Sequence, residues 1–130
     1  MSPLNFLTVF LPSEWLREFL MFSVVIKVAC ASMFMAIFLR SLFKKNDFSL
    51  VIFGCSFGFC AFFMGYYWNT IWLDTVCITP LVALGTVKLF TEGKFRLYIV
   101  SLALSLLTNY YIGLFACIFV LLSFIAYNIV

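Results

Sequence analysis

The stretch YYWNTIWLD, from Tyr66 to Asp74, gathers the side chains of this chain that are best suited to binding a sugar. Four of its nine residues are large aromatics, and it also holds one amide and one carboxylate. Aromatic faces pack on the C–H faces of sugar rings, and amide and carboxylate groups bond the hydroxyls. Asp74 is therefore a candidate catalytic base. The candidate substrate-binding residues of this stretch are Tyr66, Trp68, Asn69 and Trp72.

The same stretch has a simpler explanation. Tyr and Trp are enriched where a membrane meets water, so an aromatic belt would account for the rings without a ligand. A carboxylate near the start of a helix is stabilised by the helix dipole, which would account for Asp74. Asp74 is also a candidate partner for a cation. Its roles as a catalytic base, as a carboxylate near a helix start and as an ion-pair partner therefore all stay open at this point.

Lys27 is the candidate cation, because it lies inside an apolar run. A charge at membrane depth costs about 2.5–3.5 kcal/mol on insertion scales. The side chain could extend to the interface, as long lysine stems do. Alternatively, it could face a polar cavity and pair with a carboxylate or a lipid phosphate, which makes Lys27 a candidate substrate-binding residue.

The composition indicates a membrane protein. Of 130 residues, 66% are hydrophobic and 10% are charged, and the mean hydropathy is +1.20. A soluble domain has about 45–50% apolar residues. The net charge of +3 is small and scattered, so we expect no nucleic-acid partner.

The residue types also exclude several kinds of site. The chain has no His, which excludes His-based catalysis and most His-ligated metals. It contains no phosphate-binding Gly motif, so nothing indicates ATP hydrolysis. Five cysteines lie in apolar runs without a C-x-x-C pair and are expected to be small buried side chains: Cys30, Cys55, Cys60, Cys77 and Cys117. We expect no metal and no cofactor.

The apolar runs predict an all-α, polytopic transmembrane helix bundle. A spanning helix needs about 20 apolar residues. Five spans are expected, near 19–43, 48–65, 71–90, 95–109 and 111–128. Residues 1–16 are too few to cross and are expected to form an interfacial or re-entrant segment. The polar break from Thr108 to Gly113 favours a tight hairpin over one long final helix. The whole chain, 1–130, is expected to be part of a transmembrane domain.

The loop charges predict the orientation. Loops 40–47 and 88–96 lie on the same side of the membrane and hold six of the eight basic residues: Arg40, Lys44, Lys45, Lys88, Lys94 and Arg96. Because basic loops are retained in the cytoplasm, we expect both loops there. The chain would then start on the outer side, which leads us to expect that a preceding span is missing and that the chain is a fragment.

This orientation places a second polar and aromatic turn beside the first. Asn109, Tyr110 and Tyr111 fall on the same outer side as the stretch from Tyr66 to Asp74. We therefore add these three residues to the candidate substrate-binding set.

Two further features concern helix packing. Gly54 and Gly58 form a small-x-x-x-small pattern, which allows two helices to approach closely. Pro80 falls inside the third span, where it removes a helix hydrogen bond and is expected to cause a kink.

Several short segments of the chain resemble the YfhO family of bacterial membrane proteins. The matching pieces run in order along nearly the whole chain: SPLN at Ser2, FLPSE at Phe10, LFKKND at Leu42, NTIWLD at Asn69, PLVALG at Pro80, EGK at Glu92 and YIVSLALSLLTNYYIG at Tyr98. Members of that family are much longer and look like GT-C-type glycosyltransferases.

The resemblance implies a reaction. It implies that a sugar moves from a polyprenyl-phosphate donor to a cell-wall polymer, such as lipoteichoic acid, on the outer face of a bacterial plasma membrane. The chain would be an early part of such an enzyme, and it is not expected to be active alone. Two alternatives stay open: a transporter or flippase component, and a membrane scaffold without its own chemistry.

Overall fold

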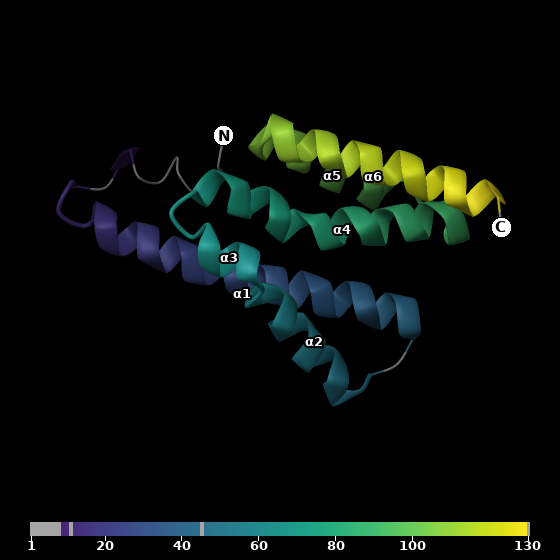
Figure 1. Cartoon of the computed structure of the whole chain (residues 1–130), viewed down its shortest axis with the longest axis horizontal. Helices are drawn as coiled ribbons and strands as arrows, with labels where there is room; N and C mark the ends of the chain where they lie inside the picture. The colour runs from purple at the N-terminus through teal and green to yellow at the C-terminus, as the bar shows by residue number, and fades with distance from the viewer. Residues whose placement is uncertain (1–8, 11, 45, 130) are drawn as a thin grey trace.

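The computed structural model describes residues 9–10, 12–44 and 46–129, and all regular structure within these ranges is helical. The elements are α1 (Leu16–Phe43), α2 (Phe48–Gly58), α3 (Ala61–Gly65), α4 (Thr70–Glu92), α5 (Arg96–Thr108) and α6 (Tyr110–Ile129). The predicted all-α helix bundle is confirmed (Figure 1). Most of the predicted interfacial segment, residues 1–8 and 11, lies outside the described residues.

Four helical stretches are long and apolar enough to cross a membrane. They are α1, the combined stretch Phe48–Gly65, α4 and α6. The remaining helix, α5, has only 13 residues and is about 20 Å long at 1.5 Å per residue. It therefore falls short of a hydrocarbon core of about 30 Å.

The stretch 48–65, predicted as one span, is divided into α2 and α3. Cys60 has extended backbone, with φ −64° and ψ 158°, and breaks the helical path. The break follows Gly58, whose residue type has a weak preference for helix. The two pieces nevertheless form one apolar stretch, and α2 packs against α1.

Helix α4 is the centre of the bundle. It contacts α1 on one side and α5 and α6 on the other (Figure 1). Half of its most apolar 18-residue window is buried, against 11–17% for the other three spanning stretches. Its residues Leu73 and Cys77 pack with Ala31 and Phe63 in a small apolar core. Pro80 lies inside α4 and is buried.

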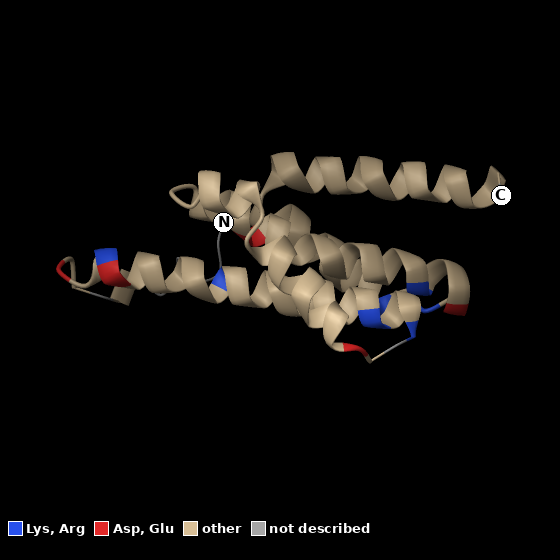
Figure 2. Ribbon diagram, turned by 60° about the horizontal axis from the view of Figure 1, so that its bottom comes forward, with Lys and Arg blue, Asp and Glu red and all other residues tan. Residues whose placement is uncertain are grey.

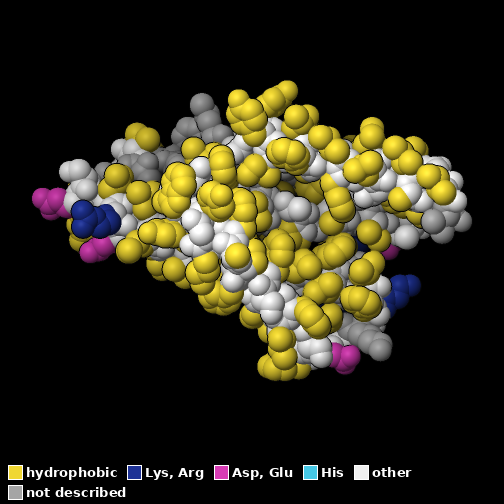
Figure 3. Space-filling model, viewed as in Figure 1, with side chains coloured by type: hydrophobic (Ala, Val, Ile, Leu, Met, Phe, Trp, Pro, Cys, Tyr) yellow, Lys and Arg dark blue, Asp and Glu magenta, His cyan; other side chains and the backbone are white. Residues whose placement is uncertain are grey.

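The surface and the interior have the polarity expected of a membrane protein. Hydrophobic side chains cover much of the face seen in Figure 3. The interior, in contrast, holds several polar side chains: Ser23, Lys27, Asp74, Thr75, Thr86, Ser101, Ser105, Thr108 and Asn109. Since lipid tails solvate apolar surface, it is the polar groups that gain from being enclosed between helices.

Helices α5 and α6 form the predicted hairpin. Asn109 connects them with extended backbone, and its side-chain Oδ1 accepts a hydrogen bond from the backbone N–H of Tyr111 at 3.0 Å. Gly113 then lets α6 approach α5, since a Cβ there would lie 3.0 Å from the Cα of Leu106.

The two ends of the bundle differ in character. One end carries the α1–α2 and α4–α5 connections, where Figure 2 shows a group of basic residues; we call it the basic end. The opposite end carries the turn 66–69 before α4 and the α5–α6 hairpin; we call it the aromatic end. Both predicted basic loops thus lie at the same end of the molecule.

Candidate functional site

Lys27 and Asp74 form a buried ion pair between α1 and α4. The Nζ of Lys27 lies 2.8 Å from Oδ1 of Asp74 and donates a further hydrogen bond to the carbonyl oxygen of Thr70 at 2.9 Å. The two side chains are 2% and 7% exposed. Of the alternatives for Lys27, the structure therefore contains the carboxylate pair and not the extension to the interface.

Local structure explains how the pair forms. Asp74 follows Thr70, the first residue of α4, by one helical turn and so lies just beyond the first turn, where the helix dipole acts most strongly. Lys27 lies 11 residues into α1 and faces α4, with Ser23 one turn before it on the same helix face. The parallel course of α1 and α4 brings these positions together (Figure 1).

One carboxylate oxygen of the pair remains available. Oδ2 of Asp74 is buried and accepts no hydrogen bond from any of the described residues. The hydroxyl of Ser23 is in the same situation. Buried polar atoms are nearly always hydrogen-bonded, so such exceptions call for an explanation, such as a bound water, strain or a catalytic role. The lone pairs of Oδ2 can accept a proton from a hydroxyl group.

An aromatic cluster lies at the end of α4 nearest the pair. The ring of Tyr66 lies 6.2 Å from that of Trp68, 5.8 Å from that of Trp72 and 5.0 Å from that of Phe62, measured between centroids. The first three side chains remain partly exposed, between 37% and 68%. The structure thus gathers three of the candidate substrate-binding residues into one cluster around Tyr66.

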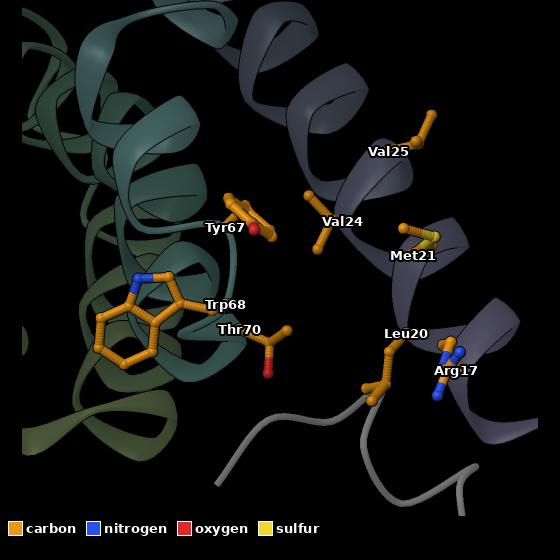
Figure 4. Close-up of a pocket in the computed structure, with 8 residues that line it drawn as sticks. All are labelled: Arg17, Leu20, Met21, Val24, Val25, Tyr67, Trp68 and Thr70. Atoms are coloured by element: carbon orange, nitrogen blue, oxygen red, sulfur yellow. The ribbon is translucent and has the colours of Figure 1, made fainter.

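Two grooves open at the aromatic end. The first, of about 480 Å³, has residues of α1 on one wall and the turn before α4 on the other (Figure 4). Its lining is almost wholly apolar, with one cation: Arg17, Leu20, Met21, Val24, Val25, Tyr67, Trp68 and Thr70. Thr70, whose carbonyl accepts from Lys27, connects this groove to the ion pair.

The second groove, of about 550 Å³, joins the two aromatic turns. Its lining includes Trp72 from α4 and Tyr111 from α6. The predicted juxtaposition of these turns is therefore present for this pair. The single external region expected from the sequence is, however, divided into two grooves, because Trp68 lines the first groove and Trp72 the second.

The remaining candidate residues have different surroundings. Asn109 is buried and its side chain caps the start of α6, which is a structural task. Tyr110 is exposed and lies edge-on to Tyr111, with ring centroids 6.2 Å apart. Asn69 precedes α4 and is half-buried, and its side chain makes no capping hydrogen bond.

The two glycines of α2 face α1. A Cβ on Gly54 would lie 2.7 Å from the carbonyl oxygen of Ser32, and one on Gly58 would collide with the Ser32 hydroxyl. The absence of a side chain at both positions therefore allows α1 and α2 to approach closely, as the small-x-x-x-small pattern predicts.

Sequence reasoning missed the buried hydroxyl groups between α4 and α5. Thr75 and Thr108 share a hydrogen bond of 3.0 Å between their Oγ1 atoms. Ser101, Ser105 and Thr108 are all buried on one face of α5. Their spacing of four and then three residues is the signal that would have identified this face. No metal-binding group of His, Cys, Asp or Glu exists within the described ranges.

Four helical stretches long and apolar enough to cross a membrane indicate a multi-pass membrane protein. Over residues 1–130 the sequence matches the family described as "Bacterial membrane protein YfhO". The chain belongs to this family. Comparison with curated proteins and with solved structures gave no significant match.

Proposed function

We propose that this chain is part of a membrane glycosyltransferase that acts at the outer face of the bacterial plasma membrane. The donor is a sugar linked to polyprenyl phosphate, and the acceptor is a cell-wall polymer; the family resemblance favours lipoteichoic acid. The observation that carries the proposal is the buried Lys27–Asp74 pair next to the aromatic cluster. Intramembrane ionisable residues mark functional sites by default, since their burial is costly.

Asp74 acts as the catalytic base in this proposal. The acceptor hydroxyl oxygen forms a bond to the anomeric carbon, and the bond from that carbon to the donor phosphate oxygen breaks. The hydroxyl proton passes to Oδ2 of Asp74, and polyprenyl phosphate leaves with the electron pair. Lys27 holds the carboxylate in place through Oδ1 and supplies a positive charge near the departing phosphate.

The aromatic side chains bind the sugars. Trp72 and Tyr111 line one groove, where their faces can pack against the sugar rings of an acceptor. Trp68 lines the first groove, and Tyr66 lies beside both Trp68 and Trp72. Asn69 lies in the same turn before α4, and Tyr110 lies against Tyr111 at the hairpin. The first groove, with Arg17 and an otherwise apolar lining, suits the isoprenoid chain and phosphate of the donor.

Access to Asp74 requires a local opening at the aromatic end, because the carboxylate is buried. The carboxylate is 7% exposed and lies one helical turn after the start of α4, so a substrate hydroxyl can reach Oδ2 only if this end of the helix opens. Loop and lid movements complete many enzyme active sites when substrate binds.

The orientation is part of the proposal. The basic loops 40–47 and 88–96 lie in the cytoplasm, and the aromatic end lies outside. The lipid-linked donor is thus used on the outer face.

A transfer assay tests the proposal. The whole enzyme of which this chain is proposed to be part is reconstituted in vesicles with a radiolabelled polyprenyl-phosphate sugar, and label in a lipoteichoic acid acceptor is measured. Transfer that depends on this protein supports the proposal. Donor that crosses the bilayer without transfer would instead favour a transporter or flippase, for which the helix break at Cys60 is the specific observation. If neither transfer nor transport is observed, the scaffold alternative remains.

A further inference from the structure

A third groove lies at the basic end, between α1 and α2. The two helices touch at Gly54, where a Cβ would lie 2.7 Å from the Ser32 carbonyl oxygen and 3.1 Å from the Cβ of Ala36. From this contact α2 diverges from α1 toward the loop that joins them (Figure 1). The groove between the diverging helices has a volume of about 470 Å³, within the range of roughly 300–1,000 Å³ for ligand sites.

The lining of this groove changes from apolar to polar along its length. Met33 and Ile37 of α1 and Val51 of α2 are 42–52% exposed and line its apolar part. Arg40 and the loop residues Asn46 and Asp47 line its polar part. An apolar wall with a cation and an amide at one end has the polarity of a phospholipid, with its acyl chain inside the membrane and its headgroup at the surface.

We propose that this groove binds one anionic phospholipid with a hydroxyl-bearing headgroup, such as phosphatidylglycerol. The acyl chain packs along Met33, Ile37 and Val51. The phosphate accepts hydrogen bonds from the Arg40 guanidinium and the Asn46 amide. The carboxylate of Asp47 accepts hydrogen bonds from the headgroup hydroxyls.

Charge favours an anionic lipid over a zwitterionic one. The loop 40–47 contains three basic residues and one acidic residue, a net charge of +2. Basic segments next to a membrane attract anionic lipids by about 1 kcal/mol per Lys or Arg near the surface, which corresponds to about fivefold in affinity. An ethanolamine headgroup could pair with Asp47, but its ammonium group would be repelled by the remaining cations. This site is at the opposite end from the proposed sugar site and does not depend on it.

Native mass spectrometry of the full chain in detergent tests this inference. The protein is incubated with equimolar phosphatidylglycerol and phosphatidylethanolamine, and the lipid retained by the wild type is compared with that of three variants. Arg40→Gln should reduce retained phosphatidylglycerol about fivefold. Ile37→Trp fills the apolar part of the groove and should also displace it. Lys88→Gln, at the same end but outside this groove, is the matched control and should retain the lipid.

Three results would overturn the inference. The first is equal retention of the two lipids by the wild type. The second is unchanged retention in Arg40→Gln when circular dichroism shows native helix content. The third is an equal loss in Lys88→Gln, because that would indicate a general effect of charge. If Ile37→Trp fails to fold, the comparison of Arg40→Gln with Lys88→Gln decides the question alone.

Discussion

The Nζ of Lys27 and Oδ1 of Asp74 lie 2.8 Å apart and join α1 to α4 inside the bundle. Removing two charges from water is costly, and their attraction offsets the cost only with good geometry and further hydrogen bonds. Lys27 has such a bond to the carbonyl of Thr70. The pair therefore fixes how α1 and α4 sit against each other at the end where the aromatic cluster lies.

Breaking the pair should destabilise the protein. Asp74→Leu leaves the Lys27 ammonium buried without its carboxylate, which should lower the free energy of unfolding by about 3–5 kcal/mol. The double variant Lys27→Met/Asp74→Leu removes both charges and should recover most of this loss. Unfolding by denaturant in mixed micelles measures both values.

An exposed pair provides the control. Lys94 and Glu92 lie 2.7 Å apart, with side chains 72% and 45% exposed. Glu92→Gln should therefore leave the unfolding midpoint unchanged. If Lys27→Met/Asp74→Leu were as unstable as Asp74→Leu, the unpaired Lys27 charge would not be the cause of the lost stability.

The glycines of α2 should not tolerate a methyl group. Gly58→Ala places a Cβ against the Ser32 hydroxyl and should destabilise the α1–α2 contact by about 1–3 kcal/mol. Gly65→Ala is the matched control, because nothing lies within 4 Å of a Cβ there. Thermal unfolding of the two variants in detergent checks the difference, and equal melting temperatures would argue against close packing at Gly58.

The hydroxyl pair between α4 and α5 should contribute modestly. In a double-mutant cycle of Thr75→Val and Thr108→Val, the coupling energy should be about 0.6 kcal/mol and at most about 1.7 kcal/mol. Thr91→Val, which removes an exposed hydroxyl bonded only within its own helix, should show no coupling to Thr75→Val. A zero coupling between Thr75 and Thr108 would contradict the hydrogen bond.

Much of the fold could be predicted from the sequence, because apolar length reports directly on spanning helices. The hairpin at Asn109 was predictable from its polar residues and the length limit. The break at Cys60 was not, since the residues around it are as apolar as the helices on either side. A hydropathy pattern alone cannot report a local change of backbone angle.

The candidate site was predictable only in part. Lys27 and Asp74 stood out because charges are rare in apolar runs. The sequence predicted a carboxylate or a lipid phosphate as the partner of Lys27, and Lys27 as a candidate partner of Asp74. The division into two grooves could not be predicted, because it depends on how the rings around Tyr66 pack beside α4. Asn109 looked equivalent to Asn69 in sequence, yet its side chain caps a helix.

The proposed orientation can be checked by labelling. In a variant without native cysteines, Tyr110→Cys at the aromatic end should react with an impermeant maleimide on intact cells. Asn46→Cys, in the basic loop, should react only after the cells are opened, because positive loops face the cytoplasm. The opposite labelling pattern would place the proposed sugar site on the wrong side of the membrane.

The role of Asp74 in sugar transfer is the central claim, and the transfer rate of Asp74→Asn tests it most directly. Asparagine keeps the size of the side chain and an oxygen for Lys27, but it cannot serve as a base. Tested in the whole enzyme of which this chain is proposed to be part, this variant should lose stability through the unpaired Lys27 charge but keep native helix content. The folded fraction should transfer sugar at least about 100-fold more slowly, the lower end of the usual contribution of a general base. A folded variant with the wild-type rate would contradict the account.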